Sequence, residues 1–379
     1  MAAARRVLAI VPGFSRQLDD ASIPALRTLL LAEAAFGADV LVLALRHPPG
    51  PGRYRIGPLL VETLGAGAAR GLGRLALLRR AVAAGLAFAA EGATPTEVWG
   101  FWADEPGFVA VEVGRRLGVP VTVALMGGEL ADLPALGYGV GQERLGRWLR
   151  DHALRGADVV TVGSRFLQTR ALAAGVTPDR LQLRPLPVEV ARFAHVPRRP
   201  RLAGLPLRVG VLASLVAVKQ HAALLCAVAR LRAEGAAIHL DLCGDGPLRA
   251  ALVAQANSLG LADALHLRGA LPWSQVPAWL SDIDLHVLPS AWESQGMATL
   301  EAAAAGVAVA GSRVGALPEI AAAVATWAPD DDADLFRALR RVTLRAAGEP
   351  GWLHRCGEAA RAEVIAGEAG QAALRLQRR

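Results

Sequence analysis

The chain has 379 residues, of which 53% are hydrophobic, and a formal net charge of +7. This length predicts two domains, and the hydrophobic content excludes a disordered chain. No apolar run reaches the length of a membrane span, and residues 1–12 lack the layout of a signal peptide. The positive charge favours phosphorylated ligands and anionic membrane surfaces. No motif for nucleic-acid binding is present, so nucleic acid is not expected as a partner.

Arginine supplies nearly all of this positive charge, and Lys219 is the only lysine in the chain. In such a composition, a retained lysine hints at a site where a compact ammonium group is preferred. The three cysteines, Cys226, Cys243 and Cys356, lie far apart and show no metal-ligand spacing. We therefore expect a reducing cytoplasm and no metal site.

The first half of the chain alternates strand-like and helix-like runs, which is the pattern of an α/β fold. Strands are expected at residues 7–11, 40–45, 97–102 and 119–125, and an amphipathic helix at 23–36. Residues 46–54 form a Pro/Gly-rich loop by composition. Asp104 and Glu105 follow the third of these strands, and as isolated acids they are expected to be solvated or to cap the next helix.

Two further segments of this half carry a pattern. Residues 69–80 (ARGLGRLALLRR) mix leucine with arginine, which is typical of a surface helix with a solvated arginine face. A basic helix resting on anionic lipid is the alternative for this segment. Ser164 is placed as a helix N-cap in the strand-to-helix step at 157–166. The stretch at 191–206 is rich in Pro and Arg and has no apolar period, so it is the expected hinge.

The second half restarts with a strand at 207–212, a loop that holds Lys219, and a helix at 221–232. A strand at 238–242 then leads into the glycine turn CGDGPLR. The third glycine of a dinucleotide-binding G-x-G-x-x-G would fall at Arg249, so that fingerprint fails. A strand at 264–269 and a helix at 273–282 follow, and Trp273 and Trp279 are expected in the core.

Residues 288–319 (LPSAWESQGMATLEAAAAGVAVAGSRVGALPE) predict a loop, a helix and a strand directly after a strand at 283–288. In such a parallel unit the loops after both strands open on one edge, where ligands bind. Gly296 and the N–H groups of Met297 and Ala298 form a helix N-terminus suited to phosphate. Glu293 and Glu301 flank it, and carboxylates accept hydrogen bonds from sugar hydroxyls. A nucleoside-diphosphate sugar carries both kinds of group.

Glu293, seven residues, Glu301 and the following EAAAAGVAVAGSRVGALPE resemble the donor-site signature of retaining GT-B glycosyltransferases of family four. The resemblance is strongest between residues 209 and 320. It implies that Glu293 contacts the hexose of the donor and that Glu301 contacts its ribose. It also implies transfer with retention of configuration, with no cofactor besides the nucleotide-sugar donor and no metal.

The resemblance extends to further positions, with departures. The family's G-R-L-x-x-x-K-G segment aligns with ASLVAVKQ, so Lys219 matches the diphosphate-binding lysine, while Ser214 stands at the arginine position. Met126 stands where the family often has a histidine. Relatives place the base near the end of the strand that contains Arg268. The expected contacts on the acceptor side are Gly13, Arg16, Gly127, Gly128 and Glu129.

These inferences predict an α/β protein of GT-B architecture, with two Rossmann-like domains facing each other across a cleft. The expected parts are an acceptor-side domain at 1–190, a hinge at 191–206, a donor domain at 207–351, and a C-terminal helix at 352–379 that packs back on the first domain. The expected enzyme transfers a hexose to a glycan, lipid or small-molecule acceptor. Its expected place is the cytoplasm, with possible peripheral contact with an anionic membrane, in cell-envelope glycan synthesis.

Three alternatives stay open on the sequence. Ser214 and Met126 motivate a catalytically degenerate GT-B protein that binds a nucleotide or a partner without transfer. An NAD-linked oxidoreductase is disfavoured by the failed glycine fingerprint. Another reaction on a nucleotide sugar, such as epimerisation, would be recognised by product formation without an acceptor.

Overall fold

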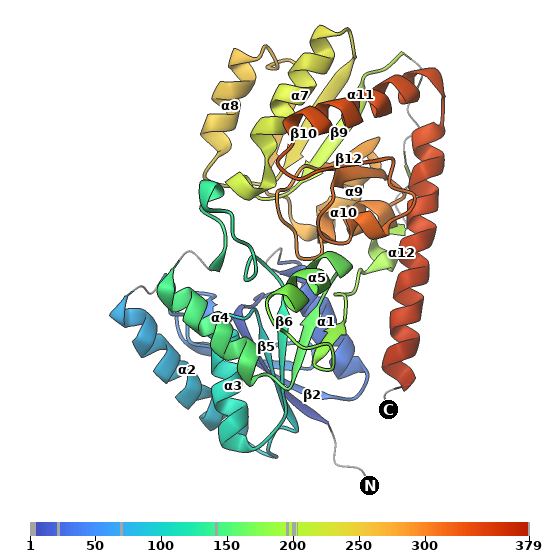
Figure 1. The fold of residues 1–379 in the computed structure, drawn as a ribbon. Coiled ribbons are helices and arrows are strands. Elements are labelled where there is room, and N and C mark those ends of the chain that lie inside the picture. The colour runs from blue at the N-terminus through green and yellow to red at the C-terminus, as the bar shows by residue number, and fades with distance from the viewer. Residues whose placement is uncertain are drawn as a thin grey trace. The chain divides into compact units, whose positions relative to one another are not determined.

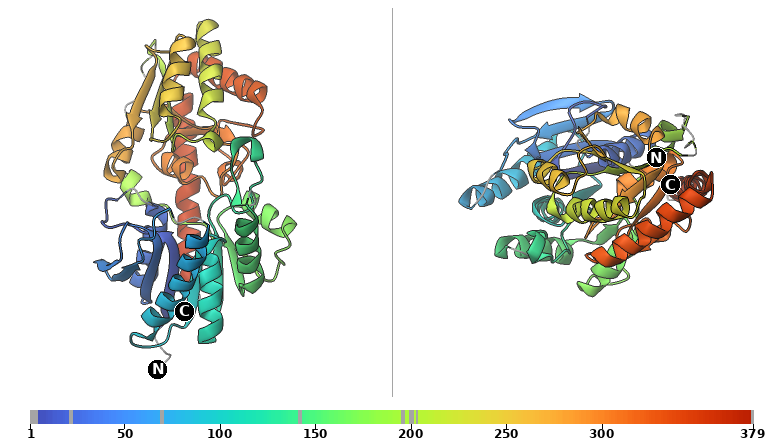
Figure 2. Two further views of the ribbon diagram at one scale, coloured as in Figure 1. Left: turned by 90° about the vertical axis from the view of Figure 1, so that its left-hand side faces the viewer. Right: turned by 90° about the horizontal axis from the view of Figure 1, so that it is seen from above.

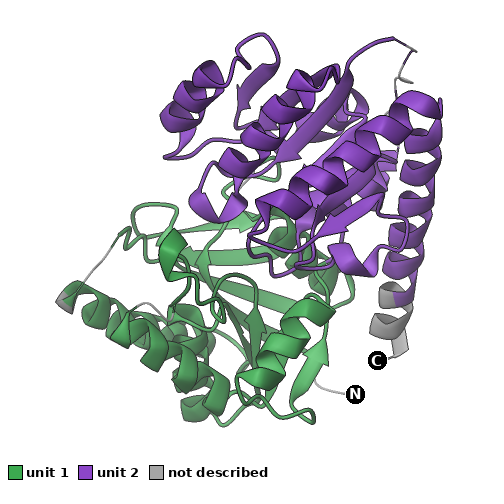
Figure 3. Ribbon diagram, turned by 45° about the horizontal axis from the view of Figure 1, so that its top comes forward, with its two compact units in different colours: residues 1–186 green, residues 187–379 purple. Residues whose placement is uncertain are grey.

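The computed structural model describes residues 5–20, 23–68, 71–140, 143–194, 197–198, 202 and 204–377. The chain divides into two compact units, Met1–Leu186 and Pro187–Arg379 (Figure 3). Each unit has its own largely parallel sheet with helices packed on it. The division between the units falls near the predicted end of the first domain at residue 190.

The sheet of unit 1 has the strand order β3-β4-β2-β1-β5-β6-β7-β8. All neighbouring strands are parallel except β3 and β4, which form an antiparallel hairpin. From the central β1, the chain passes first to β2 on one side and later to β5 on the other. The strands are β1 (Arg6–Gly13), β2 (Asp39–His47), β3 (Gly52–Ile56), β4 (Leu59–Thr63), β5 (Glu97–Phe101), β6 (Val121–Leu125), β7 (Val159–Val162) and β8 (Leu181–Leu183).

Five α-helices among the described residues of unit 1 cover this sheet, and α3 packs between α2 and α4 (Figure 1). They are α1 (Pro24–Ala35), α2 (Leu72–Ala90), α3 (Glu105–Leu117), α4 (Arg144–Gly156) and α5 (Arg165–Ala173). Ser164 caps α5 as predicted, because its hydroxyl accepts a hydrogen bond of 3.2 Å from the N–H of Leu167. The four strands and the first helix predicted from the pattern are confirmed, with ends shifted by a few residues.

The prediction of a loop across residues 46–54 is wrong. β2 continues to His47, and β3 begins at Gly52 and pairs with β4, where Arg53 lies opposite Glu62. The two side chains form an ion pair, and a cross-strand pair of opposite charge stabilises a hairpin. The hairpin also buries Ile56, Leu59 and Val61 in the core of unit 1. In the expected helix at 69–80, residues 69 and 70 lie outside the described residues, and Arg79 and Arg80 are exposed.

The sheet of unit 2 is wholly parallel and has the order β11-β10-β9-β12-β13-β14. This is the 3-2-1-4-5-6 strand order of the Rossmann fold. In that fold the chain builds the sheet outward from the first strand on one side, and then returns to add the fourth strand on the other side. Here the reversal lies between β9 and β12. The strands are β9 (Leu207–Leu212), β10 (Ile238–Cys243), β11 (Leu265–Gly269), β12 (Leu285–Leu288), β13 (Ala308–Ser312) and β14 (Ala325–Trp327).

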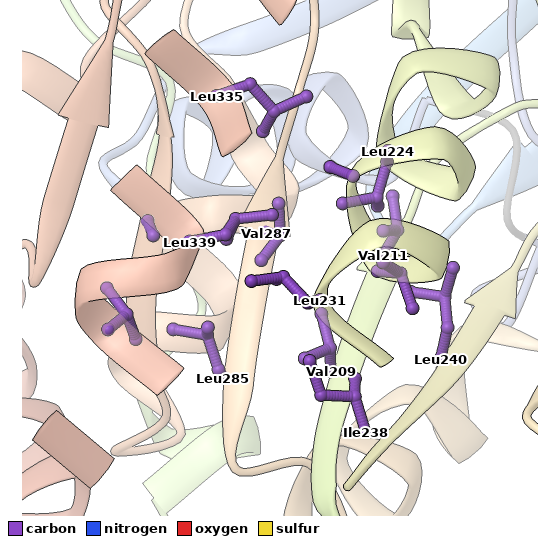
Figure 4. Packing of buried hydrophobic residues seen from close by; sticks show 14 of the residues in the cluster. Val209, Val211, Leu224, Leu231, Ile238, Leu240, Leu285, Val287, Leu335 and Leu339 are labelled. Carbon is purple, nitrogen blue, oxygen red and sulfur yellow. The ribbon is translucent and has the colours of Figure 1, made fainter. Parts of the chain in front are cut away.

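Two apolar clusters lie on the two faces of this sheet. One contains Leu224 of α7 and Leu339 of α11 (Figure 4). It also contains Leu252 of α8, and α7 and α8 lie side by side in Figure 2. The other contains Leu280 of α9 and Ala303 of α10 and includes the buried Trp273 and Trp279, as predicted. The helices are α6 (Val190–Ala194), α7 (His221–Ala233), α8 (Arg249–Ser258), α9 (Val276–Ser281), α10 (Met297–Ala304), α11 (Asp332–Gly348) and α12 (Trp352–Gln377).

The last helix, α12, is joined to unit 2 by carboxylates. Glu363 accepts hydrogen bonds from the N–H groups of Ala321 (2.8 Å) and Ala322 (2.9 Å), and Glu368 accepts one from Val188 (2.9 Å). The expected packing of this helix on the first domain stays a prediction. Among the described residues, no helix is long and apolar enough to cross a bilayer.

Candidate functional site

The reversal of strand order between β9 and β12 brings two loops of unit 2 together. Residues 213–220 follow β9 and residues 289–296 follow β12, so both loops leave the carboxyl edge of the sheet. The N–H of Ala291 donates a hydrogen bond of 2.8 Å to the carbonyl oxygen of Val218. In open parallel sheets, this position is where ligands bind.

An ion pair joins the two loops. Lys219 Nζ lies 2.5 Å from Glu293 Oε1, and the hydroxyl of Ser290 donates a hydrogen bond of 2.7 Å to the same oxygen. The side chains of Lys219 and Glu293 are 23% and 11% exposed, so the pair is shielded from solvent but reachable. The sequence analysis missed Ser290, whose place directly after a buried strand was its only signal.

The N-terminus of α10 lies at the same edge. Gly296 adopts a left-handed conformation (φ 81°), and the first backbone bond of the helix runs from Thr299 N–H to the Gly296 carbonyl (3.0 Å). The N–H groups of Met297 and Ala298 precede that bond, so they point out of the helix end toward any bound anion. Gly315 lies against this loop, because a Cβ there would approach the carbonyl oxygen of Gln295 to 2.8 Å.

Glu301, one turn into α10, has a different environment from Glu293. Its side chain is buried, and burial raises the pKa of this carboxyl to about 7. The indole of Trp273 and the charge of Arg192 act in the opposite direction, and the Arg192 guanidinium lies 3.9 Å from the centre of the Trp273 ring. A protonation equilibrium near neutral pH therefore controls how well this group accepts hydrogen bonds from hydroxyls.

Two other predicted donor-side residues have structural partners. The carbonyl oxygen of Ser214 accepts a hydrogen bond of 3.1 Å from Nε2 of His221, which fixes the loop after β9. Arg268 lies on β11 and pairs with Asp241 at 2.7 Å. Asp241 is buried and also accepts a hydrogen bond of 3.0 Å from the indole of Trp279, so Arg268 neutralises a buried charge within the sheet.

In unit 1, the residues expected on the acceptor side lie in two loops. Gly13 ends β1, where a Cβ would come within 2.9 Å of the Cβ of His47 on β2, so a side chain does not fit. Arg16 is exposed, and its guanidinium donates a hydrogen bond of 3.2 Å to the carbonyl oxygen of Pro49. Its backbone N–H donates to Asp20, which closes a turn after β1.

The second loop follows β6 and is organised around Glu129. This carboxylate is buried and accepts hydrogen bonds from the N–H groups of Met126 (3.0 Å), Gly127 (2.7 Å) and Ala103 (3.3 Å). Burial nevertheless raises the pKa of Glu129. Because its oxygens are occupied by backbone donors, Glu129 shapes the loop, and Gly127 and Gly128 present their backbone at its tip.

Asp104 and Glu105 differ from the expectation of solvated or capping acids. Glu105 is buried and forms ion pairs with Arg46 (2.7 Å) and Arg74 (2.5 Å). Asp104 precedes α3 but makes no capping hydrogen bond, and its Oδ1 atom is buried without a hydrogen-bond partner among the described residues. Both are correctly placed at the strand end, but the partners that decide their state are distant in sequence.

Two other kinds of site were considered among the described residues, namely metal-binding clusters and cavities. No group of three or more His, Cys, Asp or Glu residues in the described part of the chain is placed to hold a metal ion. A cavity of about 780 Å³ lies at the amino edge of the sheet of unit 2. In its charged lining, Arg340 binds Glu234 and Asp284 binds Arg208, while Arg198 donates to the backbone oxygens of Gly306 and Ile283.

Comparison with known families places both halves of the chain. Residues 206–344 match the family described as "Glycosyl transferases group 1", and residues 20–187 match the "Glycosyl transferase 4-like domain". The 2-deoxystreptamine glucosyltransferase of Streptomyces kanamyceticus is 32% identical over 174 residues, which cover 44% of this chain and 43% of the relative. The chain spans less than half the length of the curated relatives it matches.

Solved structures show the same fold over nearly the whole chain. The sucrose-phosphate synthase of Thermosynechococcus elongatus superposes with a TM-score of 0.78 at 20% identity and covers 99% of this chain and 98% of its own. Anabaena HepE, solved with UDP and glucose, gives a TM-score of 0.70 at 15% identity and covers 99% and 100%. The chain therefore has the GT-B fold and belongs to the group 1 glycosyl transferases of the family-four type.

Proposed function

We propose that this protein transfers a hexose from a nucleoside-diphosphate sugar to an acceptor hydroxyl. The observation that carries the proposal is the edge of unit 2 between β9 and β12. There, Lys219 and the N-terminus of α10 supply positive charge, and Glu293 and Glu301 supply carboxylates. Phosphate is favoured by the first two, and sugar hydroxyls are favoured by the second two.

In this proposal, the diphosphate of the donor lies on the N–H groups of Met297 and Ala298. Lys219 moves its ammonium from Glu293 to the phosphate oxygens, and Glu293 is then available to the hydroxyls of the hexose. Glu301 accepts hydrogen bonds from the ribose. As the bond from the anomeric carbon to the phosphate oxygen breaks, its electron pair goes to the diphosphate, where these positive groups stabilise it.

The acceptor oxygen forms the new bond to the anomeric carbon on the face that the phosphate leaves, so configuration is retained. Its proton passes to the departing phosphate oxygen, which balances the step without a protein base. Positioning and electrostatic stabilisation carry the catalysis, and the reaction needs neither a metal nor another cofactor. The nucleobase is uracil in this proposal, supported by the UDP complex of the structural neighbour HepE.

The acceptor is a glycan, a lipid or a small molecule. We place the enzyme in the cytoplasm, with peripheral contact to an anionic membrane through exposed arginines such as Arg79 and Arg80 on α2. Arg74 on the same helix does not contribute to this contact, because its guanidinium is paired with Glu105. Anionic surfaces attract such basic residues within a Debye length.

Calorimetry with UDP, GDP, ADP and dTDP tests the donor site, and product analysis with the matching sugar nucleotide tests transfer. We expect UDP to bind more tightly than the other three nucleotides, its binding to weaken in Glu301→Ala, and turnover to persist after chelation of divalent metals. Binding of none of the four would contradict the proposal.

A catalytically degenerate nucleotide-binding protein is the second candidate, since Ser214 and Met126 replace an arginine and a histidine of the resembled pattern. It predicts binding of the sugar nucleotide with neither transfer nor hydrolysis.

A further inference from the structure

Unit 1 has its own reversal of strand order, between β1 and β5. The two strands pair in parallel from Val7 opposite Glu97 to Ile10 opposite Gly100, while β2 lies on the other side of β1. The loops after β1 and β5 therefore leave the same edge at the position that favours ligand binding. The loop after β5 contains Trp102, Ala103 and Asp104.

Trp102 is held in an unusual conformation at this edge. Its φ angle is 73°, a left-handed value that a bulky residue adopts only where its surroundings impose it. The indole lies against the loop after β6, because a Cβ on Gly127 would come within 2.6 Å of the Trp102 Nε1 atom. Trp102 packs against the apolar cluster of unit 1 and remains partly exposed.

Asp104 supplies a carboxyl group two residues after Trp102, in the same loop after β5. Its Oδ1 atom is buried and accepts no hydrogen bond from the described residues, although Glu105 and Glu129 close to it are fully engaged. The two nearby guanidinium groups are held by Glu105. Burial, followed by the charges of Glu129 and Glu105, raises the pKa of Asp104 to about 7. An unsatisfied buried acceptor is costly unless a ligand supplies donors.

A second aromatic ring lies near the same loop. A Cβ on Gly128 would come within 2.6 Å of the ring of Tyr138, so this ring lies against the backbone at the loop tip. Aromatic rings next to a carboxylate suit a ligand that has an apolar face and hydroxyl donors at its edge, which is the chemistry of a pyranose. A charged phosphate is disfavoured, since Asp104 and Glu129 repel it.

We propose that the edge formed by Trp102, Asp104 and the Met126–Gly128 loop binds a sugar ring of the acceptor, whose hydroxyls donate to Asp104 while a ring face lies on Trp102. The inference rests on the proposed glycosyl transfer and adds the acceptor class, since it requires a carbohydrate or cyclitol ring at this position. Asp104 orients the ring and takes no part in the bond changes described above.

Saturation-transfer NMR on the full chain, saturated with UDP, tests this inference. The probes are the methyl glycosides of glucose, galactose and mannose, and myo-inositol. We expect at least one probe to receive saturation from the wild type and to bind about tenfold more weakly, or not at all, in Asp104→Asn. Asp132→Asn, an exposed acid on the segment after the same loop, is the matched control and should bind as the wild type.

Two further measurements separate this site from the donor site. Glu293→Gln should keep the probe signal, because that residue lies in unit 2. Asp104→Asn should keep the affinity for UDP and should have a thermal midpoint no lower than that of the wild type. If UDP binds but no probe does, or if Asp104→Asn binds the probes like the wild type, the inference is overturned while the proposed donor site stands. If the signal is lost in Glu293→Gln instead, the ring lies in the donor site and the inference also fails.

Discussion

At the carboxyl edge of unit 2, Lys219 and Glu293 neutralise each other at 2.5 Å, whereas at the equivalent edge of unit 1 the Oδ1 atom of Asp104 has no partner among the described residues. Both edges lie where the strand order reverses. In unit 2, the phosphate of a ligand would replace the Glu293 carboxylate as the partner of the Lys219 ammonium group. In unit 1, a ligand would supply the hydrogen-bond donors that the Oδ1 atom of Asp104 lacks among the described residues. Under the two proposals above, the same topology binds a charged ligand in one unit and a neutral ligand in the other.

The largest effect that this comparison predicts is at the cation of unit 2. Replacing Lys219 with Met removes a charge-assisted bond to phosphate, so we expect UDP affinity measured by calorimetry to fall about 30- to 100-fold, or about 2–3 kcal/mol. Lys219→Arg keeps the positive charge, so its affinity for UDP should fall by less than that of Lys219→Met. A Met variant that binds UDP as tightly as the wild type would show that the helix N-terminus suffices alone.

A tenfold effect is expected from the protonation of Glu301. Its pKa is raised to about 7, so the carboxylate form grows as the pH rises, and only that form accepts hydrogen bonds at both oxygens. Affinity for UDP-glucose, whose diphosphate does not titrate in this range, should rise up to about tenfold between about pH 6 and about pH 8. In Glu301→Gln the profile should be flat. An equally steep profile in this variant would assign the titration to another group.

In unit 1 the comparison predicts an effect on stability. The pKa of Asp104 is raised in the folded state, so folding favours its protonated form, and this contribution is lost as the pH rises from about 4 through about 7. Asn cannot ionise, so Asp104→Asn should be about 1–2 kcal/mol more stable than the wild type above this range, and the gain should shrink toward low pH. Thermal midpoints at several pH values measure the difference, and a gain that does not depend on pH would contradict the assignment.

The matching change in unit 2 should have the opposite sign. Glu293→Gln leaves the ammonium of Lys219 without its carboxylate, so the midpoint should fall at neutral pH rather than rise. A rise in both variants would mean that the two edges do not differ in the way described.

The smallest effect is expected at Arg268. Its guanidinium pairs with the buried Asp241, and the pair is partly exposed, so Arg268→Ala should cost about 1 kcal/mol of stability. Affinity for UDP relative to GDP should stay unchanged in this variant, because the side chain is engaged within the sheet. If calorimetry shows that the preference for UDP over GDP changes in this variant, Arg268 contacts the nucleobase, as the sequence suggested.

The elements around Glu293 and Glu301 are predictable from sequence because their signals are local. The buried strand runs, the alanine-rich helix and Gly296 and Gly306 at its ends lie within a few residues of one another, and the structure has the helix at Met297–Ala304. The α/β class and the parallel pairing of most strands also follow from the alternation of strand-like and helix-like runs. What the sequence could not show is which acids would find partners.

The partners of Glu105 were missed because they are distant in sequence. Glu105 is held by Arg46 and Arg74, and the two pairs span 59 and 31 positions, so no local window contains them. The hairpin β3–β4 was missed for a local reason, because the Pro/Gly-rich composition of residues 46–54 outweighed the alternation of Tyr54 and Ile56 with arginine in β3. The left-handed Trp102 has no signature either, because bulky residues are not expected at positive φ.

Because Lys219 is the only lysine of the chain, it allows the carboxyl edge of unit 2 to be labelled selectively. Reductive methylation with isotopically labelled formaldehyde modifies primary amines, and apart from the chain terminus Lys219 carries the only such side-chain group. Two resonances would therefore report on the whole protein, and one of them comes from the ammonium that faces Glu293. Its chemical shift would follow the exchange of carboxylate for phosphate without any mutation.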